Sequence, residues 1–361
     1  MIPISQPDIQ EDEINAVIDV LKSGIIVQGE KTQELEQLFT KICGTKYAVA
    51  VNSGTAALHT ALYAAGIGPG DEVITSPFTF GATANSILMV GAKSIFVDIT
   101  LDSYNIDASK IEEAITPNTK AILPINLYGQ AADYSKIQTI AKKHKLLIIE
   151  DAAQSVGSKY DVRASGNLGD IGCLSLYATK NIMCGEGGMI TTNDKEYFDR
   201  AKLFRNHGQP ENEKYNYLDL GFNYRLTDIA AAIGIEQVKK LSQYTSRRQS
   251  IAKKYSESFN DVPGIITPII KSNRTHVFHQ YTIFVTDEFK LSRDELQKYL
   301  FEKNIQTNVY YPKPLNKFDQ FLSSGTFTNA TKAAKRVLSL PVHPQLTDDD
   351  VNYIISTFLH I

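Results

Sequence analysis

Short apolar runs alternate with helix-like segments through the first half of the chain, and this alternation constrains the fold most. The apolar runs are residues 47–51, 72–75, 94–97, 121–125 and 146–149, and the helix-like segments between them are 55–65, 82–90, 109–115 and 135–144. This order is typical of an α/β domain with a mainly parallel sheet. Residues 146–149 are apolar on both faces, as expected of a strand that helices cover on each side.

The segments on either side of this alternation predict further elements and a second, smaller unit. Two helices precede it, at residues 14–21 and 35–42, and each ends at a glycine, Gly24 or Gly44. Beyond it we expect strands at 171–176 and 189–192, helices at 196–205 and 228–241, and a long helix from about 244. A compact α+β unit follows, with strands at 280–285 and 306–309 and helices at 294–303 and 348–359. The 361 residues therefore divide into a large domain, 1–243, which includes an N-terminal arm, and a small C-terminal domain, 244–361.

Charge and composition exclude several classes of protein. The chain has 37 Lys and Arg residues against 40 Asp and Glu residues, a net charge of −3. A protein that coats nucleic acid or an anionic membrane needs a basic surplus, so neither partner is expected. No apolar stretch is long enough to span a membrane, the first residues lack the pattern of a secretory signal, and three cysteines are too few for a disulfide framework. We expect a cytoplasmic protein.

Residues 52–57 follow the first strand of the alternation and open a helix. Gly54 allows a ligand to approach the backbone, and Thr55 offers a hydroxyl group. Because the first N–H groups of a helix have no partner within it, this stretch is a candidate phosphate site. Serine, threonine and asparagine are also the usual N-cap residues, so a plain helix cap is the alternative explanation.

Two acidic residues, Glu150 and Asp151, end a strand that we expect to be buried. Buried carboxylates are costly unless a positive group meets them. One interpretation is that Asp151 faces a protonated ring nitrogen or a metal, and the other is that one acid caps the next helix. Further metal ligands at a diagnostic spacing are missing from the sequence, so no metal site is predicted.

Lys180 follows a strand and precedes a glycine-rich turn at 185–188. A partly buried lysine has a lowered pKa and can act as a nucleophile that forms a Schiff base, although most lysines are simply exposed. The glycines could equally serve only a hairpin turn. A phosphate site, an acid for a ring nitrogen and a Schiff-base lysine are together the three anchors that pyridoxal 5′-phosphate (PLP) needs.

These motifs and several others, in their order along the chain, resemble the DegT/DnrJ/EryC1/StrS family of PLP-dependent sugar aminotransferases. The resemblance is nearly full-length and rests on residues 2–7, 23–24, 52–59, 76–80, 150–154, 175–181, 205–208, 221–225, 279–281 and 310–315. It implies the fold type I (aspartate aminotransferase-like) architecture, an α/β large domain with a mainly parallel, mixed sheet and a smaller α+β domain.

The resemblance also implies which residues contact the cofactor ring. Lys180 would form the Schiff base with PLP and then carry the proton between the two reacting carbons. Asp151 would pair with the ring nitrogen, Gln154 would lie near the ring hydroxyl, and Phe80 would stack on the ring.

For the cofactor phosphate, the resemblance implies Gly54, Thr55 and Ser175 as the residues that bind it within one subunit. Asn223 would reach the phosphate of the other subunit's cofactor. The expected assembly is therefore a homodimer with shared active sites, and isologous dimers are also the commonest assembly in general.

The activity implied is transfer of the amino group of L-glutamate to a nucleotide-linked keto-sugar, of the NDP-4-keto- or NDP-3-keto-6-deoxyhexose type. Such a reaction belongs to amino-sugar biosynthesis, for example for lipopolysaccharide or another polysaccharide. Candidate substrate contacts are His279, Tyr310, Tyr311 and Lys313, for which ordinary domain packing is the alternative explanation.

Two other classes of function stay open at this point. The first is a PLP enzyme of the same fold with another reaction, such as a sugar dehydratase or a cyclitol aminotransferase. The dehydratase branch of the family has a histidine in place of the lysine, and Lys180 counts against it. The second is a non-catalytic PLP-binding regulator, which would not need a nucleophile.

Overall fold

The computed structural model describes residues 1–361 except 322 and 324, and a seven-stranded sheet forms its centre. The sheet order is β1-β9-β8-β5-β4-β2-β3, with β1 at Tyr47–Val51, β2 at Glu72–Thr75, β3 at Lys93–Phe96, β4 at Thr119–Ile122, β5 at Leu147–Asp151, β8 at Ile171–Ser175 and β9 at Gly188–Thr192. Only β9 runs antiparallel to its neighbours, and the other pairs are parallel. The mainly parallel, mixed sheet predicted from the sequence is therefore confirmed.

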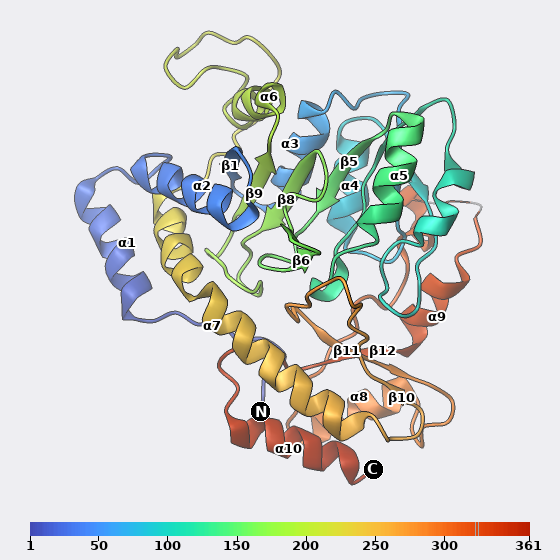
Figure 1. Ribbon diagram of the computed structural model, residues 1–361. Helices are drawn as coiled ribbons and strands as arrows, with labels where there is room; N and C mark the ends of the chain where they lie inside the picture. The colour runs from blue at the N-terminus through green and yellow to red at the C-terminus, as the bar shows by residue number, and fades with distance from the viewer. Residues whose placement is uncertain (322, 324) are drawn as a thin grey trace.

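Helices cover both faces of this sheet (Figure 1). One face packs against α3 (Gly54–Ala64), α4 (Gly81–Met89) and α6 (Lys195–Arg205). The other packs against α2 (Glu30–Cys43), α5 (Tyr134–His144) and the first part of α7 (Asp228–Phe259). Side chains of β1 point alternately to the two faces of the sheet. Val49 and Val51 pack into the core on the side of α3, and Ala48 and Ala50 pack into the core on the side of α2.

The C-terminal unit is a smaller α+β layer beneath the sheet (Figure 1). Its three-stranded antiparallel sheet has the order β10-β11-β12, with β10 at Ile265–Ile266, β11 at Tyr281–Val285 and β12 at Val337–Leu340. Its helices are α8 (Arg293–Glu302), α9 (Thr328–Arg336) and α10 (Asp348–Leu359). Helix α7 runs unbroken from the large sheet into this unit, so the boundary that we place at residue 243 falls inside a continuous helix and stays a prediction.

Several local expectations were wrong. Residues 306–309 form no strand, because Asn308 makes only an isolated bridge to Ser339 while β12 pairs with β11. Residues 109–115 form two 3₁₀ turns, Ala108–Lys110 and Glu112–Ala114, instead of an α-helix. Strands β10 and β12, helix α9 and the hairpin of β6 (Lys159–Tyr160) and β7 (Arg163–Ala164) were not expected.

The first residues of the chain and the N-terminal helix α1 (Glu11–Ser23) join the two units. Ile2 pairs with Ile305 of the C-terminal unit, and α1 packs along α7. In the part of the chain that the structure describes, no helix is long and apolar enough to cross a membrane.

Candidate active site

A cavity of about 710 Å³ opens where β1, β5 and β8 end and where the C-terminal unit meets the large sheet. The carboxyl ends of strands are the usual ligand site in open α/β sheets. Most of the residues predicted from the sequence line this one cavity: Gly54, Thr55, Phe80, Asp151, Gln154, Ser175, Lys180, His279, Tyr310 and Tyr311. The tertiary structure thus brings together residues as far apart in the sequence as Gly54 and Tyr311.

Lys180 lies in the loop after β8, is partly buried, and lines the cavity. Burial lowers the pKa of Lys180 to about 8, although the negative charge of Asp151 raises it. A lysine with such a pKa is partly neutral at physiological pH and can act as a nucleophile or a base. The alternative of an ordinary exposed lysine is therefore wrong.

Asp151 is the last residue of β5, and the residue is 4% exposed. It accepts hydrogen bonds from Thr83 Oγ1 at 2.8 Å and from the N–H of Ala153 at 3.2 Å. Burial raises the pKa of Asp151, while these hydrogen bonds and the charge of Lys180 oppose the shift. The carboxylate has no salt-bridge partner among the described residues, so a cationic ligand in the cavity would supply the missing charge.

Glu150 faces the other side of the sheet, because neighbouring residues of a strand point in opposite directions. Its carboxylate accepts hydrogen bonds from Asn126 Nδ2, Ser165 Oγ and the N–H groups of Gly166 and Leu168, at 2.8 to 2.9 Å. Of the two acids, Glu150 is therefore structural and Asp151 is available to a ligand.

The N-terminus of α3 forms one wall of the cavity. Ser53 caps the helix, since its Oγ accepts a hydrogen bond from the N–H of Ala56. The N–H groups of Gly54 and Thr55 take part in no hydrogen bond with the described residues. The helix cap does not exclude the predicted phosphate site, because the cap leaves two N–H groups of the first turn available.

Two glycines allow this helix end to approach the sheet closely. A Cβ atom at Gly54 would lie 2.8 Å from Cβ of Ser175, and one at Gly188 would lie 2.2 Å from the carbonyl oxygen of Ser53. Gly188 begins β9, so the glycine-rich turn does more than form a hairpin. It holds the Ser53–Gly54 backbone against β8 and β9, which sets the Ser175 hydroxyl beside the helix N-terminus.

Aromatic and amide side chains form the opposite wall. Gln154 Oε1 accepts a hydrogen bond from the N–H of Tyr128 at 2.7 Å, and Gln154 Nε2 donates to the Tyr311 hydroxyl at 3.2 Å. Phe80, at the start of α4, is 61% exposed and lies 6.3 Å from the ring of Tyr311. An exposed ring at the mouth of a cavity is available to stack on a flat ligand.

His279 enters the cavity from the segment before β11. It is 6% exposed, and its Nδ1 atom has no hydrogen-bond partner among the described residues. Burial and the positive charges of Lys180 and Arg248 hold the pKa of His279 well below its usual value. The imidazole is therefore neutral, with hydrogen-bonding capacity that the protein itself does not use.

Two predicted residues do not line this cavity. Asn223 is exposed, and its carbonyl oxygen accepts a hydrogen bond from Asn52 Nδ2. Lys313 lies with its amino group 4.3 Å from the centre of the Phe318 ring. Within a single chain, neither side chain contributes to the site.

The donor set fits a phosphorylated pyridine aldehyde. The cavity offers a carboxylate without a cation, a helix N-terminus with two available N–H groups, a nucleophilic amine and an exposed aromatic ring. Among the described residues, no group of three or more His, Cys, Asp and Glu side chains could hold a metal ion.

Sequence reasoning missed some residues of the cavity. Thr83 holds the carboxylate of Asp151, and Tyr177 and Glu186 also line the site. Tyr177 and Glu186 flank Lys180 and could have been considered for that reason. Thr83 carried no signal, because a threonine within a helix is ordinary until its neighbour across the fold is known.

The whole chain is similar to known aminotransferases. The DegT/DnrJ/EryC1/StrS aminotransferase family matches residues 7–359. Two curated relatives are GDP-perosamine synthase of Caulobacter vibrioides, 37% identical over 98% of this chain and 96% of that protein, and UDP-2-acetamido-2-deoxy-3-oxo-D-glucuronate aminotransferase of Pseudomonas aeruginosa, 39% identical over 95% of this chain and 94% of that protein.

A solved structure of similar fold is Spr1654 of Streptococcus pneumoniae, which is known in a PLP form and a PMP form. Both forms have a TM-score of 0.93 and are 31% identical to this chain. Each match covers 99% of this chain, with 97% of the PLP-form chain and 96% of the PMP-form chain. This likeness confirms the predicted architecture over almost the full length.

Proposed function

This chain belongs to the DegT/DnrJ/EryC1/StrS aminotransferase family and is an aminotransferase. We propose that it moves the amino group of L-glutamate to a nucleotide-linked keto-sugar, with PLP as cofactor. The observation that carries the proposal is that Lys180 lines the same cavity as the carboxylate of Asp151, where burial lowers the pKa of the lysine to about 8.

Residues of the cavity would contact each part of the cofactor. Asp151 would hold a proton on the ring nitrogen, and Gln154 would hydrogen-bond the ring hydroxyl. The N–H groups of Gly54 and Thr55 and the Ser175 hydroxyl would bind the phosphate, where the helix N-terminus favours negative charge. Phe80 would stack on the ring.

PLP, when bound, supplies an aldehyde that takes up an amino group and a ring that accepts electrons from the adjacent carbon. The protein's own contribution is proton transfer. In the glutamate half-reaction, Lys180 Nζ would remove the proton from Cα of L-glutamate and pass it to the cofactor carbon that takes up the amino group. In the second half-reaction the same amine would carry a proton in the opposite direction, to the carbonyl carbon of the keto-sugar. A base of pKa about 8 suits this role near neutral pH.

The acceptor is proposed from the two curated relatives, whose names specify a GDP-linked and a UDP-linked sugar. His279, Tyr310 and Tyr311 are candidates to contact its sugar ring, since they line the cavity on the side opposite α3. A role in amino-sugar synthesis for a surface polysaccharide, and a cytoplasmic location, are parts of the same proposal. Lys313 stays a candidate for the nucleotide.

A homodimer with shared sites is also part of the proposal. Asn223 is exposed and outside the cavity of its own chain, as expected if it completes the phosphate site of a partner. Exposed apolar side chains on and just after α1 would be covered in such a dimer: Ile14, Ile18, Leu21, Ile25, Ile26 and Val27.

The decisive experiment follows the cofactor spectrum on addition of L-glutamate alone. We expect the PLP absorbance to convert to that of pyridoxamine phosphate, with one equivalent of 2-oxoglutarate per active site. Lys180→Ala should lose this reaction by several orders of magnitude, because the base is gone. Lys159→Ala, at an exposed lysine in the hairpin of β6 and β7, serves as the control.

Full conversion by Lys180→Ala would contradict the role of this lysine. A screen of NDP-4-keto- and NDP-3-keto-sugars with glutamate, followed by mass spectrometry, then identifies the acceptor. A cyclitol ketone that outcompetes every keto-sugar would favour the cyclitol aminotransferase instead.

A further inference from the structure

Residues 176–187, the lysine loop, connect β8 to β9 and carry Lys180. Before the reacting side chain, the N–H of Lys180 donates to the carbonyl oxygen of Tyr177 at 2.8 Å and closes a turn. After it, Asn181 is 4% exposed and Ile182 is fully buried in the core on the side of α2. Because a lysine side chain is a flexible four-carbon stem, a fixed main chain is the first condition for directing its amine.

The side chain of Asn181 joins the lysine loop to the C-terminal unit. Its Nδ2 atom donates to the carbonyl oxygen of Val277 at 2.9 Å, in a buried position. Val277 belongs to segment 276–280, which leads into β11 and brings His279 into the cavity. Since Asn181 directly follows Lys180, this one hydrogen bond connects the two walls of the cavity that carry Lys180 and His279.

Segment 276–280 is itself anchored from two further sides. From α7, the side chains of Arg248 and Gln249 donate to two of its carbonyl oxygens, at 3.2 and 3.0 Å. From the loop after β4, the carbonyl oxygens of Tyr128 and Gly129 accept hydrogen bonds from two of its N–H groups, at 3.2 and 2.9 Å. A segment held in this way is rigid, so a hydrogen bond to it restricts where the lysine loop can lie.

The other atom of the same amide has no partner. Asn181 Oδ1 is buried without a hydrogen-bond partner among the described residues. A buried acceptor without a partner destabilises a fold. Stability alone does not account for this oxygen, whereas a need for the amide donor beside it does.

We propose that Asn181 is a positioning residue for Lys180, because its hydrogen bond to Val277 holds the lysine loop against segment 276–280 and so keeps the lysine amine at a fixed distance from the wall that carries His279. Asn181 does not line the cavity and would act only through Lys180. The amine has to reach two carbons in turn, and a misplacement of about 1 Å can cost roughly 100-fold in rate. The inference rests on the proposed function.

Asn181→Ala removes the hydrogen bond to Val277 and provides the first test. In the PLP-loaded enzyme, the rate of the glutamate half-reaction should fall by about 10- to 100-fold while KM for glutamate stays within about twofold, because the base moves and the donor's other contacts remain. Stopped-flow absorbance measures the rate. Asn181→Ser, whose hydroxyl ends one bond short of the amide nitrogen, repeats the test with a milder change.

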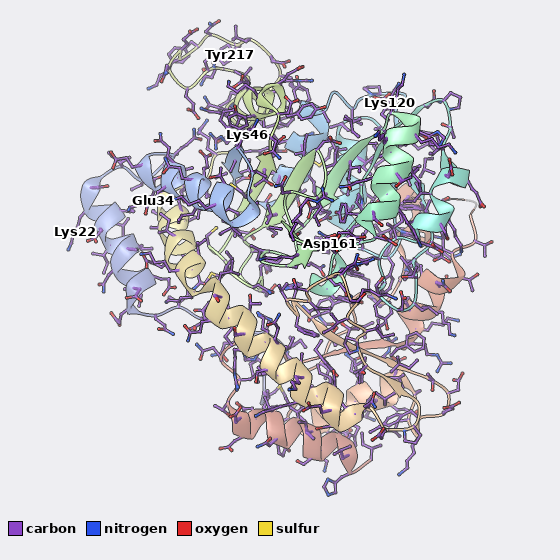
Figure 2. The ribbon with its side chains drawn as sticks, in the orientation of Figure 1. Lys22, Glu34, Lys46, Lys120, Asp161 and Tyr217 are labelled. Carbon is purple, nitrogen blue, oxygen red and sulfur yellow. The ribbon has the colours of Figure 1, made fainter. Side chains whose placement is uncertain are left out.

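A second readout uses the cofactor-free protein and needs no catalysis. Burial lowers the pKa of Lys180, and a loosened loop admits water. The pH at which an amine-reactive reagent modifies Lys180 at half its maximum rate should therefore rise from near 8 by about one pH unit in Asn181→Ala. Peptide mass spectrometry measures this midpoint, with the exposed Lys120 of β4 (Figure 2) as an internal reference in every variant.

Asn329→Ala is the matched control. Asn329 lies in the first turn of α9, and its Nδ2 atom donates to the carbonyl oxygen of Ile99 in the large domain at 2.7 Å. It joins the two units by the same kind of hydrogen bond as Asn181 but does not line the cavity. This variant should lose stability in thermal unfolding, and it should leave both the glutamate rate and the midpoint for Lys180 unchanged.

An unaltered rate and midpoint in Asn181→Ala and Asn181→Ser would overturn the inference, and so would equal effects from Asn329→Ala. If Asn181→Ala failed to fold, Asn181→Ser would decide between these outcomes. Absence of the glutamate reaction in the unaltered enzyme would instead overturn the proposed function, and the midpoint in the cofactor-free protein would still test the role of Asn181.

Discussion

Lys180 and Asp151 are oppositely charged groups that share one buried cavity, and each affects the protonation of the other. Burial favours the neutral form of both residues, and their mutual attraction opposes it. A cofactor with a protonated ring nitrogen would place a positive charge next to Asp151 and would react with the neutral amine of Lys180. Such a cofactor is therefore compatible with a charged Asp151 and a neutral Lys180.

Asp151→Asn should lower the pKa of Lys180 below about 8, because the charge that raises it is removed. In the cofactor-free protein, the rate at which an amine-reactive reagent modifies Lys180 should reach half its maximum near pH 8, and at a lower pH in the variant. Transamination should fall by roughly 100-fold or more. Peptide mass spectrometry measures the modification, with the exposed Asp161→Asn as control. A shift to higher pH would contradict the coupling.

Gly54→Ala should separate α3 from Ser175, because the new Cβ atom would lie 2.8 Å from Cβ of Ser175. Such overpacking costs about 1–3 kcal/mol in the free energy of unfolding, and the affinity for PLP should fall with it. Gly68→Ala is the matched control, since a Cβ atom there meets nothing within 4 Å. Chemical denaturation and PLP titration of both variants give the comparison, and equal effects would argue against a phosphate site at α3.

At the scale of elements, α3 and α4 act on the site from one face of the sheet. Helix α3 presents its N-terminus, and α4 presents Phe80 at its start and Thr83 one turn later. The sequence predicted both helices to within one or two residues, since each follows a short apolar strand. It did not predict that Thr83 holds Asp151, because that contact joins positions 68 residues apart.

Thr83→Val should raise the pKa of Asp151, because the hydrogen bond from Thr83 lowers it. Loss of this bond to a buried carboxylate should cost about 1–3 kcal/mol of stability and weaken PLP binding. Thr60→Val is a fitting control, since Thr60 is buried on α3 and its hydroxyl has no partner among the described residues. Thermal unfolding should therefore separate the two variants. If Thr60→Val proved the more harmful, the assignment would fail.

At the scale of the whole molecule, the exposed apolar surface around α1 is the strongest sign of a partner subunit. Ile14, Ile18 and Leu21 recur at helical spacing on α1 and are exposed, whereas Glu13 and Val20 are the buried residues of this helix. Ile18→Asp should convert the proposed dimer, of twice 40.1 kDa, into monomers and reduce activity, because in that proposal Asn223 completes the site of the partner. Light scattering during size-exclusion chromatography measures this, with Asn15→Asp on the same helix as control. A dimer that tolerates Ile18→Asp would place the interface elsewhere.

The sequence by itself determined the α/β class and most of the elements and predicted the three chemical anchors, because periodicity, capping residues and strand-end motifs are local signals. Only the tertiary structure decided that Asp151 and not Glu150 lines the cavity, and that His279 and Tyr311 lie in the same cavity as Gly54. It also decided that β12, and not residues 306–309, pairs with β11. A second cavity, around Arg205, is likewise formed by segments that carry no common motif. Contacts of this kind depend on how distant segments pack, and packing is settled by the whole fold at once.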